Sequence, residues 1–129
     1  MEIENSVFFW QKLDTLLLSS EIVIERPKNS AHPEYPNLIY PLDYGYFTDT
    51  VSGDAESLDL FRGSTNTRNV NAIIIAVDIL KKDVETKILL GCTSEEEMIV
   101  LRFLNQTDFQ KTVLIRRGEQ TPAWAASEN

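Results

Sequence analysis

Residues 70–90 of the chain read VNAIIIAVDILKKDVETKILL. The run from Ala72 to Val77 is apolar at consecutive positions, which is typical of a strand that is buried on both faces of a sheet. The polar residues 81–83 predict a tight turn, after which the segment from Val84 to Leu90 returns as the partner strand. We therefore expect a hairpin of two strands at the centre of the fold.

Shorter elements flank this hairpin. Apolar patterns and turn residues predict strands or extended segments at residues 22–26, 38–46, 58–61 and 112–116. Pro41 excludes a regular central strand in the second of these segments. Helices are expected from the N-cap Ser6 to about Leu18, and after Ser94, which begins a capping box with Glu97. Several short strands with two flanking helices predict a mainly β domain of the α+β class, either a small barrel or a sandwich with the helices packed outside.

Length and composition restrict the kind of protein further. The 129 residues, 43% of them hydrophobic, predict one domain over residues 1–129, with a small, polar and mobile tail at 118–129. A net charge of −8 argues against nucleic acid and anionic membranes as partners, because both bind cationic surfaces.

Cys92 is the only cysteine and is expected to be a small buried residue. The N-terminal segment lacks the basic start of a signal peptide, so we expect a cytoplasmic protein.

The segment that carries the most chemistry is the acidic turn Asp54-Ala55-Glu56-Ser57-Leu58-Asp59. A turn that leads into a strand lets its three carboxylates point into a common space. Mg²⁺ prefers oxygen ligands and keeps several waters, so such a bend is a plausible open magnesium site. Acidic turns are also common on protein surfaces, and the spacing alone does not decide between a metal site and a solvated turn.

Three further segments accompany the acidic turn. They are Ile24-Glu25-Arg26-Pro27, Tyr40-Pro41-Leu42-Asp43-Tyr44-Gly45-Tyr46 and Asp83-Val84-Glu85-Thr86-Lys87. In this order they resemble the soluble inorganic pyrophosphatases. That family has Glu-x-Pro at the end of a strand, then Tyr-Pro-x-x-Tyr-Gly, an Asp-Gly-Asp-Pro-x-Asp loop and a hairpin with further acids and a lysine. The resemblance covers roughly residues 21–111, and its most specific part is the tyrosine string with its distance to the acidic turn.

The resemblance implies a fold, a reaction and a set of site residues. The fold would be a small closed five-stranded OB-like β-barrel of the pyrophosphatase type, with one N-terminal and one C-terminal helix, in a protein that forms homo-oligomers. The reaction would be Mg²⁺-dependent hydrolysis of inorganic pyrophosphate or a related small diphosphate, with Mn²⁺ as an alternative ion. By position, the metal ligands would be Asp54, Asp59, Glu85, Asp83 and Glu25. The catalytic residues would be Glu56, as base for the attacking water, with Tyr44 and Lys87, while Tyr40 and Lys87 would bind the substrate.

The chain departs from the family pattern where the family binds phosphate. Glu34 replaces a cation, and the hairpin that carries the family's arginine is absent, because Asn37 leads almost directly to Tyr40. Thr107 and Asp108 stand in place of a Tyr-Lys pair. The acid at position 56 is also one methylene longer than in the family. Because cations stabilise the charge of a transferring phosphoryl group, these changes predict a slow or altered enzyme.

Ordinary structural roles remain open for the same residues. Tyr40 and Tyr44 could be core residues with hydroxyls at the surface, and Asp83 could simply favour its turn. Glu25 and Lys87 could be surface residues of their strands. His32, the only histidine, lies in a Pro-rich loop and is expected to be structural or solvent-exposed.

Three functions therefore compete. The first is a metal-dependent diphosphatase, and the second is a catalytically degenerate binding module with the same fold. The third is an interaction domain whose apolar first helix, with Phe8, Phe9 and Trp10, contacts a protein partner. Convergence of the predicted acids on one cavity would favour the first.

Overall fold

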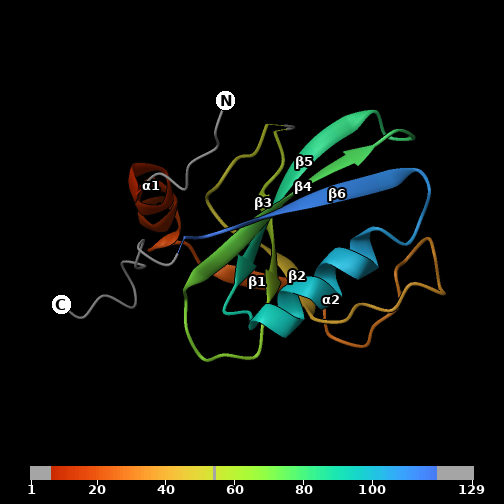
Figure 1. Cartoon of the computed structure of the whole chain (residues 1–129), viewed down its shortest axis with the longest axis horizontal. Helices are drawn as coiled ribbons and strands as arrows, with labels where there is room; N and C mark the ends of the chain where they lie inside the picture. Colours follow the sequence, from red (N-terminus) through yellow and green to blue (C-terminus); the bar gives the residue numbers. More distant parts are fainter. Residues whose placement is uncertain (1–6, 54, 119–129) are drawn as a thin grey trace.

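The computed structural model of the chain describes residues 7–53 and 55–118, which form one curled sheet with two helices (Figure 1). The elements in chain order are α1 (Val7–Leu17), β1 (Ile22–Arg26), β2 (Asp43–Phe47), β3 (Leu58–Arg62), β4 (Val70–Asp78), β5 (Asp83–Leu90), α2 (Ser94–Leu104) and β6 (Gln110–Arg116). The predicted mainly β architecture with two helices is confirmed; β1 has the predicted bounds, and the other elements differ from the expected ones by a few residues at one or both ends. The predicted N-cap at Ser6, the predicted ligand Asp54 and the predicted tail from residue 119 onward lie outside the described residues.

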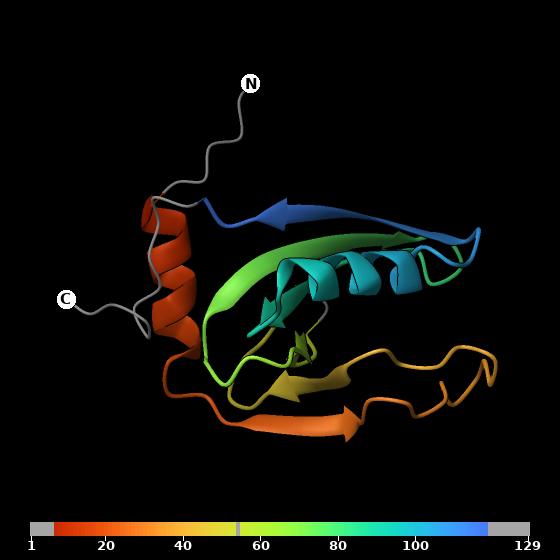
Figure 2. The same ribbon diagram turned by 60° about the horizontal axis from the view of Figure 1, so that its bottom comes forward.

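The sheet contains six strands in the order β1-β2-β3-β5-β4-β6. Neighbouring strands are antiparallel except β3 and β5, which run parallel. The predicted hairpin of β4 and β5 lies inside the sheet, between β3 and β6. The predicted closed five-stranded barrel is wrong. The sheet curls (Figure 2) but does not close. Strand β6 pairs with β4 on the side away from β1, so β1 and β6 are the two open edges of the sheet within the described part of the chain.

The two helices contribute to cores on opposite faces of the sheet. Because side chains alternate along a strand, Ile88 and Leu90 of β5 point to one face and Leu89 points to the other. The core on the first face, with α1, contains Trp10, Leu17, Phe47, Leu58, Leu60, Val70, Ile73, Ile88 and Leu90. The core on the second face, with α2, contains Tyr40, Leu42, Phe61, Ala72, Ile74, Leu89, Cys92, Val100 and Leu104. In Figure 2, α2 lies inside the curve of the sheet, and α1 lies across one end of it.

The N-cap of α2 is Thr93, one residue before the predicted Ser94. The Thr93 hydroxyl accepts a hydrogen bond of 3.1 Å from the backbone N–H of Glu96, and the Glu96 carboxylate accepts one of 2.9 Å from the N–H of Thr93. The predicted capping box therefore exists, displaced by one residue. Glu97 does not take part in it, because its buried carboxylate accepts a hydrogen bond of 2.7 Å from Arg116 on β6.

A buried ion pair attaches α1 to the end of the sheet. Asp14 accepts hydrogen bonds of 3.0 and 2.7 Å from the two terminal nitrogens of Arg117, which follows β6. The side chains of Arg117 and Asp14 are only 8% and 6% exposed. The guanidinium also lies 5.5 Å from the centre of the Trp10 ring, so one cation holds two side chains of α1.

The outer side of α1 remains apolar and exposed. Phe8 is 76% exposed, Phe9 is 50% exposed and Leu16 is 53% exposed. The first helix is therefore not fully buried within its own chain, and the interaction-domain alternative keeps its support. No helix in the part of the chain that the structure describes has the length and apolar character needed to cross a membrane.

The glycine of the tyrosine string has a steric explanation. Gly45 lies in β2 opposite Ile24 of β1. A Cβ atom on Gly45 would lie 1.9 Å from the carbonyl oxygen of Val23, a separation that no carbon side chain can occupy. Glycine therefore lets β1 approach β2 closely, beside the irregularity in β1 between Ile24 and Arg26.

Cys92 is buried just after β5, as predicted. Burial is the main reason that the pKa of its thiol rises to about 12, and the acids Glu96 and Glu97 act in the same direction. The thiol therefore stays protonated at neutral pH, and its role is to pack against the core.

Candidate functional site

A cavity of about 530 Å³ opens on the same face of the sheet as α2. Its walls come from α2 and from all six strands, with β4 and β6 contributing only an end residue each, and from the segments that follow β1, β4 and α2. Both signs of charge meet in it. The charged side chains that line the cavity are Arg26, Glu34, Asp59, Asp78, Lys81, Glu85 and Lys87. Three cations and four carboxylates thus line one cavity.

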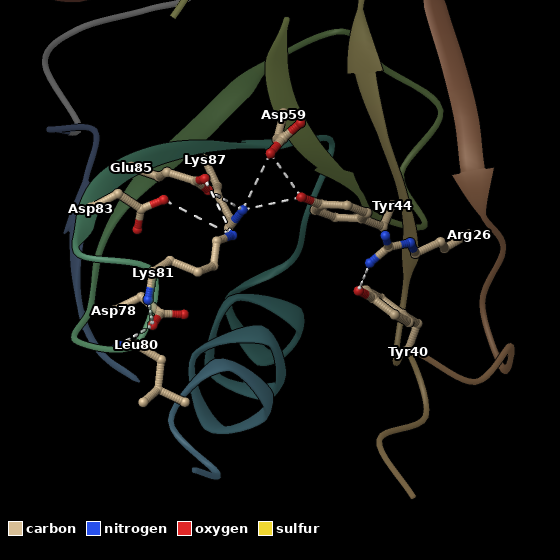
Figure 3. A network of polar contacts seen from close by, with 10 residues as sticks. All are labelled: Arg26, Tyr40, Tyr44, Asp59, Asp78, Leu80, Lys81, Asp83, Glu85 and Lys87. Atoms are coloured by element: carbon tan, nitrogen blue, oxygen red, sulfur yellow. Dashed lines mark hydrogen bonds and ion pairs between the residues drawn. The ribbon is translucent and has the colours of Figure 1, made fainter. Parts of the chain in front are cut away.

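The ammonium of Lys87 joins three groups in this cavity (Figure 3). It lies 3.0 Å from Oε1 of Glu85 and 3.3 Å from Oδ2 of Asp59, and it donates to the hydroxyl of Tyr44 at 3.0 Å. The Tyr44 hydroxyl in turn donates to Oδ2 of Asp59 at 2.8 Å. Strand register produces this convergence, because Asp59 of β3 lies directly opposite Lys87 of β5, and Glu85 precedes Lys87 by two residues on the same face.

Burial and charge set the protonation of this network. Burial raises the pKa of Tyr44 well above its ordinary value, against the opposing effect of Lys87, so the phenol is a hydrogen-bond donor at neutral pH. Burial alone would lower the pKa of Lys87, but Tyr44, Asp59 and Glu85 together raise it above its ordinary value. The site therefore holds a charged ammonium between two carboxylates.

Arg26 supplies a second cation from the opposite wall of the cavity. Its Nη1 donates to the hydroxyl of Tyr40, and its guanidinium carbon lies 5.5 Å from the Tyr40 ring centre and 5.6 Å from the Tyr44 ring centre. In the pairing of β1 with β2, Ile24 lies opposite Gly45 and Arg26 lies opposite Tyr44, so Glu25 is the extra residue of the bulge. The bulge is the local reason that Arg26 rather than Glu25 lines the cavity.

Lys81 approaches the cavity from the turn between β4 and β5. Its Nζ lies 3.6 Å from Oε2 of Glu85 and 4.0 Å from Oδ2 of Asp83. Asp78, buried at the end of β4, shapes the turn, because its Oδ1 accepts hydrogen bonds of 2.9 Å from the backbone N–H groups of Leu80 and Lys81. Sequence analysis assigned neither Lys81 nor Asp78 to the site, since a lysine-rich turn ordinarily indicates only solvent exposure.

The structure brings some of the predicted site residues together and leaves others apart. Those that line the cavity are Tyr40, Tyr44, Asp59, Glu85 and Lys87. Asp83 lies next to this group through Lys81 but does not line the cavity. Glu25 and Glu56 are exposed and do not line it either. The position of Asp54 lies outside the described residues.

The donor set for a divalent ion is small. Among residues 7–53 and 55–118, no group of three or more His, Cys, Asp or Glu side chains is arranged to hold a metal. Asp59 and Glu85 present carboxylates to the cavity, and both contact Lys87. Mg²⁺ commonly binds one or two carboxylates and takes its other ligands from water and substrate phosphates. A divalent ion in this cavity would therefore take Asp59 and Glu85 as its protein ligands and water or phosphate oxygens as the others.

Solved structures of other proteins share the fold of this chain. No protein-family model and no curated protein matches the sequence. An inorganic pyrophosphatase from Neisseria gonorrhoeae has a similar structure, with a TM-score of 0.59 and 16% identity over 78% of this chain and 83% of that protein. The inorganic pyrophosphatase from Helicobacter pylori matches with a TM-score of 0.54 and 12% identity over 94% of this chain and 91% of that protein. An inorganic phosphatase from Anaplasma phagocytophilum matches with a TM-score of 0.50 and 11% identity over 78% and 85% of the two chains. The chain therefore has the fold of the inorganic pyrophosphatases, as the resemblance in its sequence implies.

Proposed function

We propose that the chain is a divergent member of the soluble inorganic pyrophosphatases and that its cavity binds and hydrolyses inorganic pyrophosphate or a related small diphosphate with Mg²⁺. One observation carries the proposal. In a fold shared with inorganic pyrophosphatases, Lys87 and Arg26 line the same cavity as the carboxylates of Asp59 and Glu85. Cations of this kind bind phosphate oxygens, and the carboxylates are suitable ligands for a hard divalent ion.

The chain's own cations compensate in part for those that it lacks relative to the family. Arg26 carries a planar guanidinium, which matches a phosphate by donating two parallel hydrogen bonds. Its hydrogen-bond partner in the structure is the Tyr40 hydroxyl, which a phosphate oxygen would replace in this proposal. In this proposal Arg26 takes the part of the arginine hairpin that the sequence does not contain.

The carboxylates and Tyr44 have separate roles in the proposed reaction. Bound Mg²⁺ would lower the pKa of a water and neutralise phosphate charge. Asp59 and Glu85 would hold the ion, and Tyr44 donates to Asp59 and thereby fixes the direction of its carboxylate. Tyr44 is not the base, because its raised pKa keeps the phenol protonated. Glu56, in an exposed position three residues before Asp59, is assigned as the base and has to turn toward the cavity to accept a proton.

A second candidate function is an anion-binding module without turnover. The observation that favours it is the ammonium of Lys87, which bridges Asp59 and Glu85 and so lies between the two carboxylates that a metal would use. In that case the cavity binds a diphosphate through Arg26 and Lys87 without a divalent ion. Calorimetric binding of pyrophosphate in the presence of a chelator, without phosphate release in Mg²⁺, would establish this candidate.

A phosphate-release assay with pyrophosphate and Mg²⁺ tests the proposed hydrolysis. We expect release above buffer and a decrease of about a hundredfold in Asp59→Asn, because even the loss of a residue that only orients a metal ligand typically costs about 10–100-fold. Asp49→Asn is the matched control, since Asp49 is an exposed turn residue outside the cavity and an asparagine tolerates its φ of 60°. Release that is unchanged in Asp59→Asn, or no release at all, contradicts the hydrolase.

We also propose that the chain assembles as a homo-oligomer through the outer side of α1. Phe8, Phe9 and Leu16 form an exposed apolar surface there, and such surfaces are typical of protein interfaces. In sedimentation experiments we expect a mass that is a multiple of 14.7 kDa. Phe8→Ser should shift the protein toward the monomer, and a monomeric wild-type protein at all concentrations would rule out the assembly.

A further inference from the structure

The cavity has an aromatic end that a bare diphosphate does not need. The cations Arg26 and Lys87 belong to its charged part, whereas the loop after β1 and the loop after α2 contribute rings. The aromatic side chains that line the cavity from these loops and from α2 are His32, Tyr35, Phe103 and Phe109. Tyr35 and Phe109 face each other across the two loops, with ring centres 5.9 Å apart. The aromatic end is thus built from two segments that are distant in the sequence.

His32 positions this end. Its Nδ1 accepts hydrogen bonds from the backbone N–H groups of Glu34, at 3.0 Å, and Tyr35, at 3.3 Å, and its ring centre lies 5.0 Å from that of Tyr35. Burial lowers the pKa of His32, and the nearby charge of Arg26 lowers it further, so the ring stays neutral and can accept these bonds at neutral pH. The structural role predicted for His32 therefore includes holding Tyr35 at the cavity.

The size of the cavity also exceeds the needs of a bare diphosphate. A volume of about 530 Å³ lies within the range of pockets that hold organic ligands of drug size. Tyr35 is 40% exposed, so part of its surface is accessible to a ligand. Flat heteroaromatic groups stack on such rings, and Glu34, Thr107 and Gln110 add polar side chains to the same end of the cavity. A flexible alkyl chain would make no use of these polar groups.

We propose that the cavity takes an organic diphosphate with a planar aromatic group, of the nucleoside diphosphate class, in preference to bare pyrophosphate. The diphosphate binds Lys87 and Arg26, and the base stacks on Tyr35 and Phe109. This inference rests on the proposed function for the diphosphate half of the site. It adds a recognition site for the base, and the two halves can be tested separately.

Calorimetric titration of the full chain tests the inference with two ligands that are not hydrolysed. These are α,β-methylene-ADP and methylenediphosphonate, which share the diphosphonate and differ in the nucleoside. We expect the nucleotide analogue to bind about tenfold more tightly, because stacking of a base on an aromatic side chain contributes a factor of this order. Tyr35→Ala should remove this preference and leave the affinity for methylenediphosphonate unchanged. Tyr35→Phe is the matched control, because it keeps the ring and should keep the preference.

The outcomes separate the inference from the proposed function. Equal affinities for the two ligands in the wild type, or an unchanged preference in Tyr35→Ala, overturn the inference and leave the diphosphate site intact. If neither ligand binds, with or without Mg²⁺, the proposed function fails and the inference fails with it. A preference that is lost in Tyr35→Ala and kept in Tyr35→Phe supports the aromatic end as the recognition site.

Discussion

Replacing Lys87 by methionine is expected to lower the kcat/KM for pyrophosphate by about a thousandfold. Loss of a cation that stabilises a transferring phosphoryl group has effects of this size. Lys87 is buried and lies 3.0 Å from Glu85 and 3.3 Å from Asp59, so its ammonium is already inside the cavity that the substrate would enter. Methionine has a similar length and packs in the same space without a charge. Steady-state phosphate release over a range of pyrophosphate concentrations measures the effect.

Two controls make the Lys87 experiment interpretable. Lys12→Met removes a lysine from the exposed surface of α1, outside the cavity, and should leave kcat/KM unchanged. Thermal unfolding of Lys87→Met should show that the protein is folded at the assay temperature, since the variant leaves Asp59 and Glu85 without their shared cation. A folded Lys87→Met protein with wild-type kcat/KM would show that Lys87 does not act on the substrate.

Replacing Arg117 by methionine should have the largest effect on stability, a loss of about 3–5 kcal/mol in the free energy of unfolding. The pair with Asp14 is bidentate and almost fully buried, so the substitution leaves a carboxylate without its cation inside the protein. The same change removes the cation from the Trp10 ring. A decrease of roughly 10–20 °C in Tm corresponds to this loss, and thermal or urea unfolding of the full chain measures it.

The control for Arg117 is an arginine without a buried partner. Arg62→Met removes an exposed arginine at the end of β3 and should change stability by no more than about 0.5 kcal/mol. Replacing both partners, as in Asp14→Leu with Arg117→Met, should recover most of the loss, because an apolar pair of similar volume has no charge to bury. An Arg117→Met protein as stable as Arg62→Met would show that the pair does not hold α1 to the sheet.

The sequence predicted the secondary structure well because the local signals were strong. The unbroken apolar run at Ala72 to Val77 predicted a central strand, and β4 lies inside the sheet with most of this run buried, although Val77 is exposed. Sheet closure was not predictable in the same way. Whether β1 and β6 meet depends on the curl of the whole sheet, and the expectation of a closed barrel came from the family resemblance.

The sequence predicted which residues share the cavity where side-chain alternation was regular, and not where it was irregular. Asp59, Glu85 and Lys87 lie on regular strands, so their shared face follows from a period of two. Because of the bulge in β1, Arg26 lines the cavity in place of the predicted Glu25. A one-residue irregularity of this kind leaves no clear pattern in a single sequence. Asp78 was missed because its contacts are to the backbone of the following turn, which composition does not reveal.

The capping box illustrates a different limit. Both Thr93 with Glu96 and Ser94 with Glu97 satisfy the sequence pattern, so local reasoning could not separate them. Arg116, more than ten residues later in the chain, forms an ion pair with Glu97. Glu97 is therefore not available to form a capping box with Ser94, and Thr93 caps the helix instead. Long-range pairing of this kind decides between registers that are locally equivalent.

The central claim is that a diphosphate binds between Lys87 and Arg26, next to Asp59 and Glu85. A crystal structure of the full chain with imidodiphosphate and Mn²⁺ tests it most directly, because the anomalous signal of manganese locates the ion independently of the anion. We predict that the anion contacts Lys87 and Arg26, and that the ion lies on Asp59 and Glu85 with Lys87 moved toward a phosphate oxygen. An anion bound outside this cavity, or a cavity in which Lys87 still bridges the two carboxylates at saturating ligand, would contradict the account.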